Sequence, residues 1–202
     1  MEPIVEQIRG NLAEKNRARE IGLAACRDVI RLSANSIRAV HRSDFSAARE
    51  MTGRAGGLLA EAASALDSHK DIFHAGFVHD AQKEYAEACL TLALVAGEGL
   101  PAPEDLGVEH QAYLNGLGEA VGELRRHLLD RLREGDIERC ESCLGAMDEI
   151  YGALITFDYP EALTAGLRRT TDATRGILER TRGDLTVATV QKRLEDRIRD
   201  LG

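Results

Sequence analysis

Four glutamates lie in two pairs whose spacing could place their carboxylates together. Glu84 and Glu87 are three residues apart, and Glu119 and Glu123 are four apart, each pair among apolar and small residues with few cations nearby. On a helix, either spacing puts both side chains on one face. If the two faces meet, four carboxylates converge, and such a cluster is costly without a compensating cation. Oxygen ligands of this kind suit Mg²⁺ or Mn²⁺, which predicts a metal-dependent hydrolase acting on phosphate esters.

The opposing interpretation is that these glutamates are solvated carboxylates on amphipathic helices, since Glu is a common helix former. Three glycines in seven residues, Gly116, Gly118 and Gly122, fall on the predicted helix that carries Glu119 and Glu123. A glycine in a helix interior costs about 1 kcal/mol relative to alanine. The three glycines therefore predict a close approach at this helix, by another helix or by a substrate backbone.

A row of four arginines is the second feature with chemical meaning. Arg27, Arg31, Arg38 and Arg42 lie at offsets of 4, 11 and 15 residues from the first, which keeps them within about 60° around a helix. Such a row would neutralise successive phosphates along a nucleic-acid strand, whereas the alternative is a solvated face with salt bridges to neighbouring helices. Residues 29–43 contain no acidic residue, so the row is predicted to bind nucleic acid.

Composition predicts a globular, helical protein. Hydrophobic residues make up 44% of the 202 residues and charged residues 30%, which argues against disorder. Aromatic residues are only 4%, and alanine and leucine dominate the apolar set, as helix packing favours. The net charge of −8 does not exclude nucleic acid, because the two signs are segregated: residues 80–149 carry 16 acidic side chains against 6 Lys and Arg.

Cysteines and terminal sequence indicate a cellular compartment. Four cysteines are too few for a disulfide scaffold, and Cys140-x-x-Cys143 lacks the two further ligands that zinc needs, so packed thiols are expected. The N-terminus lacks the basic-then-apolar pattern of a signal peptide. The longest apolar stretch, near residues 90–97, is too short to span a bilayer. The sequence therefore predicts a cytoplasmic protein with reduced thiols and no membrane association.

Helical periodicity runs through nearly the whole chain, without the alternating pattern of strands. Turn signals divide it at Gly97–Pro103, at Gly135-Asp136, where Asp136 would cap a helix, and at Gly183-Asp184. The prediction is an all-α, seven-helix bundle that forms a single domain over residues 1–202. The helices are expected at about 3–41, 44–66 (with Ser43 as N-cap), 73–96, 108–133, 137–156 and 158–182, with a last helix that ends near 200.

Four segments carry a resemblance to a known family. They read FDYPEALTAGLRR at 157–169, ERTRGDL at 179–185, KEYAEA at 83–88 and GLGEAVGELR at 116–125. The first two resemble archaeal members of the translin/Trax family. The third looks like the Glu-Tyr-x-Glu-Ala motif of Trax-type subunits, and the fourth looks like the Trax segment that supplies a second acidic pair. The resemblance covers most of the chain, and the predicted helix count agrees with the family's seven-helix fold.

The resemblance implies a hollow homo-oligomer, an octamer or hexamer, that encloses RNA or single-stranded DNA. Trax-type subunits carry a Mg²⁺-dependent endoribonuclease site inside the shell, whereas translin-type subunits bind nucleic acid without the full acidic set. Carried over by this resemblance, Glu84, Glu87, Glu119 and Glu123 fall on the Trax catalytic and metal positions, with Mn²⁺ as a substitute for Mg²⁺. One position departs from the pattern, because Trax-type subunits have an aspartate where this chain has the longer Glu119.

The function expected from the sequence is Mg²⁺-dependent cleavage of single-stranded RNA. The mechanism would be metal-assisted phosphodiester hydrolysis, in which one glutamate, with Glu123 as a candidate, acts as general base. One alternative is a non-catalytic, translin-type nucleic-acid-binding protein, which the Glu119 departure keeps open. Another is an all-α nucleoside triphosphate pyrophosphatase, which also holds Mg²⁺ with two acidic pairs, although the Arg-rich C-terminal run does not fit that class.

Overall fold

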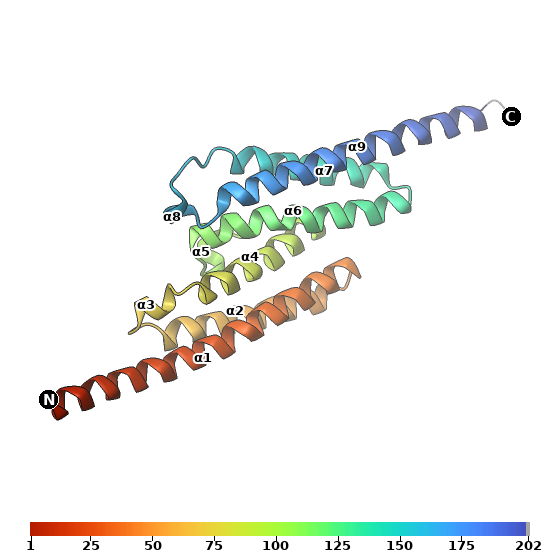
Figure 1. Ribbon diagram of the computed structural model, residues 1–202. Coiled ribbons are helices and arrows are strands. Elements are labelled where there is room, and N and C mark those ends of the chain that lie inside the picture. The colour runs from red at the N-terminus through yellow and green to blue at the C-terminus, as the bar shows by residue number, and fades with distance from the viewer. Residues whose placement is uncertain (201–202) are drawn as a thin grey trace.

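Residues 1–200 are described by a computed structural model and form nine helices joined by short turns and loops (Figure 1). No strand occurs among these residues, which confirms the predicted all-α fold class. Six helices are long and three are single turns. Their bounds are α1 Glu2–His41, α2 Phe45–Ala65, α3 Lys70–Phe73, α4 Phe77–Ala96, α5 Pro103–Leu106, α6 His110–Arg133, α7 Ile137–Leu154, α8 Glu161–Thr164 and α9 Leu167–Arg199.

The long helices pack as three adjacent pairs (Figure 1). Helix α1 packs on α2, α4 on α6, and α7 on α9, while contacts of α4 with α1 and α2 and of α6 with α7 and α9 join the pairs. Large apolar side chains such as Leu66, Leu90, Leu124, Met147 and Leu178 are almost completely buried between them. Each such burial stabilises the fold by about 1.5–3 kcal/mol. The two acidic pairs therefore lie on the two central helices, α4 and α6.

Helix α2 begins one residue later than the sequence indicated. The predicted N-cap, Ser43, has a positive φ of 59°, and the N-cap is Asp44, whose carboxylate accepts a hydrogen bond from the Ala47 backbone N at 3.1 Å. An aspartate at this position satisfies one of the free N–H groups of the first turn. The same chemistry was predicted at Asp136, which caps α7 by accepting from the Arg139 backbone N at 3.0 Å.

Three other predicted boundaries were wrong. The third predicted helix begins at Phe77 and not at Phe73, because Gly76, whose φ of +100° suits glycine, separates α3 from α4. The sixth predicted helix is interrupted at Ala165 and Gly166, both with positive φ, which separate α8 from α9. Helix α9 then runs without a break through Gly183-Asp184, so most of the sixth predicted helix and the seventh are one. Thr181 and Leu185, on either side of the glycine, are buried, and this packing outweighs the helix propensity that glycine lacks.

Both ends of the chain project beyond the bundle in opposite directions (Figure 1). Residues 1–14 of α1 are all exposed, as are nearly all residues of α9 beyond 185. A helix of 40 residues such as α1 extends about 60 Å, so its first turns pass the end of the bundle. Within residues 1–200, none of the helices has both the length and the apolar character needed to cross a membrane.

Candidate metal centre

Helices α4 and α6 approach each other closely at Gly116. A Cβ atom on this residue would lie 2.8 Å from the Lys83 carbonyl oxygen and 2.9 Å from the Glu87 backbone nitrogen. Those distances are too short for any side chain, so glycine permits the crossing. Gly118 lies similarly close to α9, whereas Gly122 has only an ordinary contact. The sequence allowed either another helix or a substrate backbone to approach these glycines. In the structure, a neighbouring helix approaches at Gly116 and at Gly118.

The close crossing brings three of the four predicted glutamates together. Glu84, Glu87 and Glu119 each offer a carboxylate oxygen, and these oxygens lie within 4.8 Å of one another. All three side chains are half-buried. Within residues 1–200, no other set of three or more acidic, histidine or cysteine side chains is arranged to hold a metal ion. We refer to Glu84, Glu87 and Glu119 as the acidic cluster.

The acidic cluster has too little positive charge for its carboxylates. Burial, reinforced by the charges of Glu119, Glu84 and Glu123, raises the pKa of Glu87 to about 8. Without a cation, the Glu87 carboxyl is therefore mostly protonated at neutral pH. Three carboxylate oxygens at this spacing are the donor set that Mg²⁺ or Mn²⁺ takes from proteins, so the residues fit a divalent cation.

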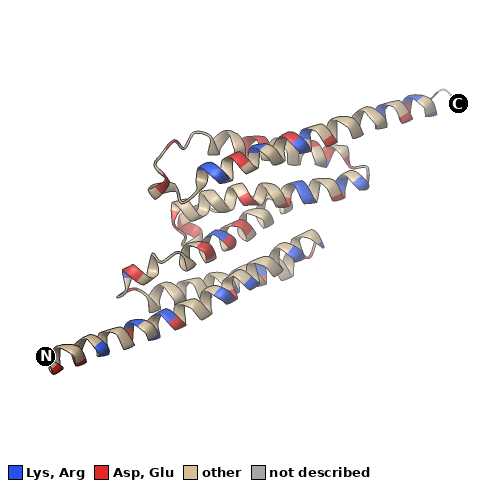
Figure 2. Ribbon diagram, viewed as in Figure 1, with Lys and Arg blue, Asp and Glu red and all other residues tan. Residues whose placement is uncertain are grey.

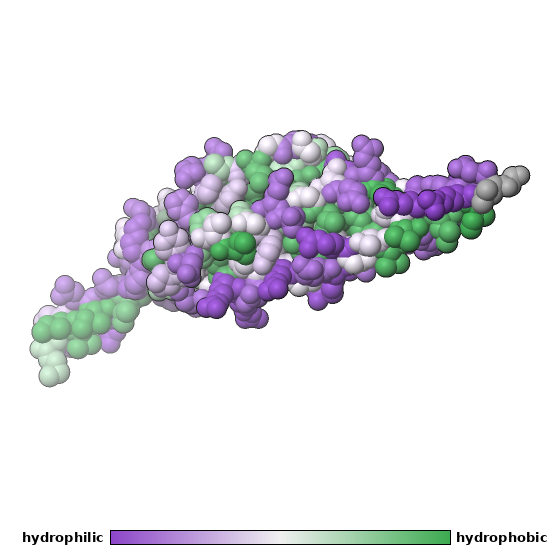
Figure 3. All heavy atoms as spheres, turned by 90° about the horizontal axis from the view of Figure 1, so that it is seen from above, coloured by the Kyte–Doolittle hydropathy of each residue, from purple (hydrophilic) through white to green (hydrophobic). Residues whose placement is uncertain are grey.

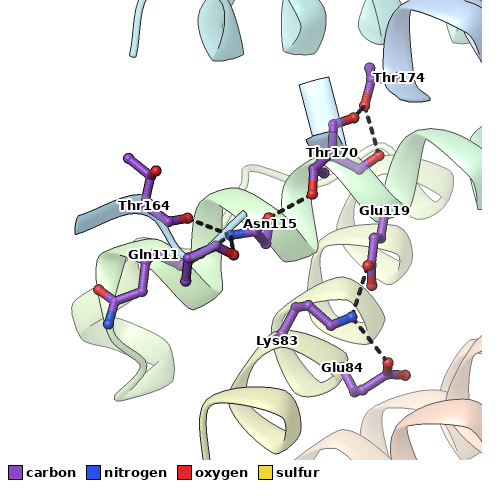
Figure 4. A network of polar contacts seen from close by, with 10 residues as sticks. Lys83, Glu84, Gln111, Asn115, Glu119, Thr164, Thr170 and Thr174 are labelled. Atoms are coloured by element: carbon purple, nitrogen blue, oxygen red, sulfur yellow. Dashed lines mark hydrogen bonds and ion pairs between the residues drawn. The ribbon is translucent and has the colours of Figure 1, made fainter. Parts of the chain in front are cut away.

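Lys83 supplies part of the missing charge, and the sequence analysis assigned it no role. Its Nζ lies 2.8 Å from Glu119 Oε1 and 3.6 Å from Glu84 Oε1 (Figure 4). Burial by itself lowers the pKa of this ammonium, but the contacts with Glu119 and Glu84 outweigh burial and leave the pKa raised. Glu87 has no hydrogen bond or ion pair among the described residues, so Lys83 mainly compensates Glu119 and Glu84, and its charge only partly offsets the raised pKa of Glu87.

The fourth predicted glutamate, Glu123, lies beside the acidic cluster and is bound by a histidine from α1. His41 Nε2 is 2.5 Å from Glu123 Oε2, and the His41 side chain is only 5% exposed. The hydrogen bond from His41 lowers the pKa of Glu123, against the opposing effect of burial. Glu123 is near enough to Glu87 to raise the pKa of that residue. Three of the four glutamates thus converge in the acidic cluster, and His41 holds the fourth, Glu123, next to them.

A polar network around Asn115 joins α6 to α8 and to the start of α9 (Figure 4). Asn115 Nδ2 donates to the backbone oxygens of Gln111 at 2.8 Å and Thr164 at 3.0 Å, and Asn115 Oδ1 accepts from Thr170 Oγ1 at 2.6 Å. Between α4, α6 and α9 lies a cavity of about 470 Å³ that has Lys83, Glu119 and Arg169 in its lining. Open space therefore adjoins the acidic cluster on its Glu119 side.

The four predicted arginines, three on α1 and Arg42 at its C-cap, are all exposed to solvent. Figure 2 shows basic residues recurring along this helix. Arg31 donates to Asp28, just outside the acid-free stretch, with Nη2 at 2.9 Å, and Arg38 donates to Asn35 at 2.6 Å. Arg27 and Arg42 form no salt bridge within residues 1–200. We refer to Arg27, Arg31, Arg38 and Arg42 as the arginine row; Arg42 directly follows His41, the residue that contacts Glu123.

Cys140 and Cys143 are buried as free thiols, in agreement with the expectation that they pack in the core. Burial raises the pKa of the Cys140 thiol to about 11 and also raises that of Cys143. Raised pKa values leave both side chains as neutral thiols, which are poor nucleophiles and poor metal ligands. The pair therefore acts as two small core side chains.

Nearly the whole chain is similar to solved structures of C3PO proteins. The crystal structure of AfC3PO, an archaeal protein, matches with a TM-score of 0.86 and 35% identity. The structure of AfC3PO in complex with duplex RNA matches with a TM-score of 0.83 and 34% identity. Each match covers 93% of this chain and 97% of the other.

Two further matches extend this comparison. The crystal structure of apo-NeC3PO, at 20% identity, has a TM-score of 0.84 over 93% of this chain and 98% of that chain, and shows the fold alone. An uncharacterized protein of Methanocaldococcus jannaschii is 28% identical over 190 residues, which are 93% of this chain and 84% of that protein. No protein-family model matches the sequence.

Fold, coverage and identity together define the class of protein. The helices follow the all-helical C3PO/translin fold, and the identity with AfC3PO extends over almost the full length of both chains. The chain belongs to the family of translin/Trax-type C3PO proteins.

Proposed function

We propose that this protein is an RNA-binding, Mg²⁺-dependent endoribonuclease. The observation that carries the proposal is the convergence of Glu84, Glu87 and Glu119 within 4.8 Å, with the pKa of Glu87 raised to about 8. Such a site is unfavourable without a cation and suited to one. The AfC3PO structure in complex with duplex RNA supports RNA as the ligand.

Glu84, Glu87 and Glu119 would hold the Mg²⁺ or Mn²⁺ ion, with Glu123 as a further ligand or as general base. When bound, the cation supplies Lewis acidity at the scissile phosphate. Lys83 offers a second positive charge at the edge of the acidic cluster for a phosphate oxygen. The extra methylene of Glu119 leaves its carboxylate within the acidic cluster, which favours the catalytic function over the non-catalytic alternative.

The arginine row would bind the RNA backbone. Its guanidinium groups are exposed along α1 and at its C-cap, so they can neutralise phosphates without reading bases. Weak sequence preference and strong salt dependence follow from such contacts. The sequence predicts a single-stranded substrate, while the AfC3PO complex contains duplex RNA, so both forms belong in the assay.

Association into a hollow homo-oligomer, an octamer or hexamer, would cover the projecting ends. Ile4, Ile8 and Leu12 of α1 are 63%, 53% and 58% exposed and recur every four residues along the helix. At the other end, a second apolar stripe is exposed on α9 (Figure 3), formed by Val187, Val190, Leu194 and Ile198. Apolar stripes of this kind mark interaction surfaces. Each projecting end therefore presents a surface to a further subunit.

Light scattering coupled to gel filtration tests the oligomer. Leu194→Glu and Ile8→Glu place a charge in the two apolar stripes and should lower the measured mass. Lys192→Glu places the same charge on the opposite side of α9 and should leave the mass unchanged. A wild-type protein that runs as a monomer would contradict the shell, without bearing on the acidic cluster.

Cleavage of labelled RNA tests the enzymatic function. Single-stranded and duplex oligomers are incubated with Mg²⁺ or EDTA, using the wild type, the Glu84→Ala/Glu123→Ala double variant and Asp130→Asn, a control two turns beyond Glu123 on α6. Cleavage should require Mg²⁺, persist in the control and be lost in the double variant, while RNA binding remains. RNA binding without cleavage by the wild type would contradict the proposal and indicate a translin-type binding protein. A wild type that neither binds nor cleaves RNA would also contradict the proposal. Nucleoside triphosphates would then be the next substrates to test.

A further inference from the structure

His41 is a polar residue whose burial is not explained by packing alone. It ends α1, yet its side chain is only 5% exposed and contacts Glu123, 82 residues further along the chain. Its other ring nitrogen, Nδ1, is buried with no hydrogen-bond partner among the described residues. A buried polar atom without a partner costs free energy that an apolar side chain would not. The contact with Glu123 is the compensating feature at this site.

The direction of the hydrogen bond follows from the two groups. An ionised carboxylate only accepts, so His41 Nε2 carries the proton and donates it to Glu123 Oε2. A hydrogen bond to an ionised carboxylate is roughly twice as strong as one between neutral groups. The other oxygen of this carboxylate, Glu123 Oε1, has no hydrogen bond within residues 1–200. His41 therefore occupies one oxygen and leaves the second available.

Glu123 is the member of the quartet whose hydrogen-bond partner comes from outside α4 and α6, the two helices that carry the four glutamates. Glu84 and Glu119 are held by Lys83, and Glu87 is held by burial and the α4–α6 crossing. A glutamate has three rotatable bonds, and the closest fixed partner of Glu123 comes from another helix. We propose that His41 is a positioning residue, which donates from Nε2 to hold Glu123 in the orientation that completes the acidic cluster for a divalent cation.

This inference rests on the proposed metal site, and it adds a residue from α1 to a site otherwise built on α4 and α6. Groups that orient metal-binding carboxylates typically change metal affinity or activity by about 10- to 100-fold when removed. The same helix and its C-cap carry the arginine row, whose last member directly follows His41. Helix α1 would thereby join the RNA-binding surface to the cation site through one hydrogen bond.

Three single substitutions separate the hydrogen bond from the bulk of the ring. His41→Leu removes the donor and keeps an apolar side chain, whereas His41→Gln retains an N–H donor at a similar reach. His127→Leu is the matched control, because His127 is also buried, has an unpartnered Nε2 and lies one turn beyond Glu123. Mn²⁺ affinity of the metal-free, full-length proteins is measured by titration calorimetry, and RNA cleavage gives kcat and KM.

His41→Leu should weaken Mn²⁺ binding about tenfold or more and lower kcat by a similar factor, with KM for RNA within about twofold of wild type. His41→Gln should recover most of both, and His127→Leu should change neither. If His41 acts through Glu123, the His41→Leu/Glu123→Gln double variant will be no worse than Glu123→Gln alone. If His41→Leu fails to fold, His41→Phe, which keeps a ring but has no donor, replaces it in the same measurements.

Unchanged Mn²⁺ affinity in His41→Leu would overturn the positioning role. So would a His41→Gln variant as impaired as His41→Leu, because the ring and not the donor would then matter, and so would a wild type that binds no Mn²⁺. The Mn²⁺ readout separates this inference from the enzymatic function. The expected pattern of Mn²⁺ affinities in a protein that cleaves no RNA would support the role of His41 and contradict the endoribonuclease.

Discussion

The acidic cluster and the arginine row are both charged, but the fold holds them in different ways. The glutamates of the acidic cluster come from two helices that touch at Gly116, are half-buried, and are partly compensated by Lys83. The arginines lie along α1 and at its C-cap, are exposed to solvent, and contact at most a residue three positions earlier. Packing thus fixes the geometry of the acidic cluster, whereas it leaves the arginine row free; in the proposed function the first would bind the cation and the second the RNA backbone.

The largest effect is expected from Glu87, the glutamate without a neutralising partner. Glu87→Gln keeps the size of the side chain but removes the charge that a cation needs, so cleavage should fall by more than about 100-fold. Affinity for RNA in EDTA should stay within about twofold of wild type, as measured by fluorescence anisotropy. An active Glu87→Gln variant would show that the acidic cluster is no more important for cleavage than other acidic residues of the surface.

Changing the arginine row should have the opposite profile. Replacing its four members by glutamine should weaken RNA binding and reduce the slope of log K against log salt by about three, as expected for four lost phosphate contacts. The kcat at saturating RNA should remain close to wild type. The control replaces four exposed arginines at the projecting ends, Arg9, Arg193, Arg197 and Arg199. Equal loss of RNA affinity in both proteins would show that net charge, and not the row, determines binding.

A substitution at Gly116 tests whether close packing of α4 and α6 is what brings the carboxylates of the acidic cluster together. Gly116→Ala introduces a Cβ at 2.8–2.9 Å from backbone atoms of α4, which forces the two helices apart. Destabilisation by about 1–3 kcal/mol and loss of Mn²⁺ affinity are expected in chemical denaturation and calorimetry. Gly122→Ala, where the added Cβ would have an ordinary contact at 4.0 Å, should instead stabilise the helix slightly. Similar behaviour of the two variants would argue against the crossing as the positioning feature.

The smallest effect is expected from Glu119→Asp, which installs the shorter acid of Trax-type subunits. The Glu119 carboxylate already lies within the acidic cluster, so Mn²⁺ affinity and kcat should change by less than about tenfold in either direction. A gain well beyond that factor would indicate that the longer side chain misplaces the carboxylate in this protein.

The sequence predicted the site residues that belong to local patterns. It did not predict those whose contacts are with residues far away along the chain. Spacing alone paired Glu84 with Glu87 and Glu119 with Glu123, and the glycines beside the second pair indicated a close approach that Gly116 makes. His41 and Lys83 were assigned no role, because their partners Glu123 and Glu119 lie 82 and 36 residues away. No periodicity reports a contact at that separation.

Helix boundaries show the same division. Asp136 was predicted as an N-cap because capping depends on a few consecutive residues. The break predicted at Gly183 was wrong because Arg125 of α6 binds Thr181 at 2.8 Å and Asp184 at 2.7 Å, so tertiary contacts hold α9 straight across the glycine. Local propensity could not include those contacts.

The pKa of Glu87 links the acidic cluster to pH. The carboxyl has a pKa of about 8 in the folded protein, against its ordinary value of 4.5. The folded protein therefore binds the extra proton, and in the absence of metal its stability should fall as pH rises from about 4.5 to about 8, by at most about 1.4 kcal/mol per pH unit. Glu87→Gln should lose this pH dependence in denaturant titrations. Cation binding must displace the same proton, so Mg²⁺ affinity should rise with pH up to about 8.

Calorimetric titration of the metal-free protein with Mn²⁺ at pH 7, repeated in buffers of different ionisation enthalpy, tests the central claim most directly. We expect one cation per subunit, release of about one proton per cation, and loss of the binding in Glu87→Gln. Binding that releases no proton and survives in Glu87→Gln would show that the cation lies elsewhere and that the acidic cluster is not the metal centre.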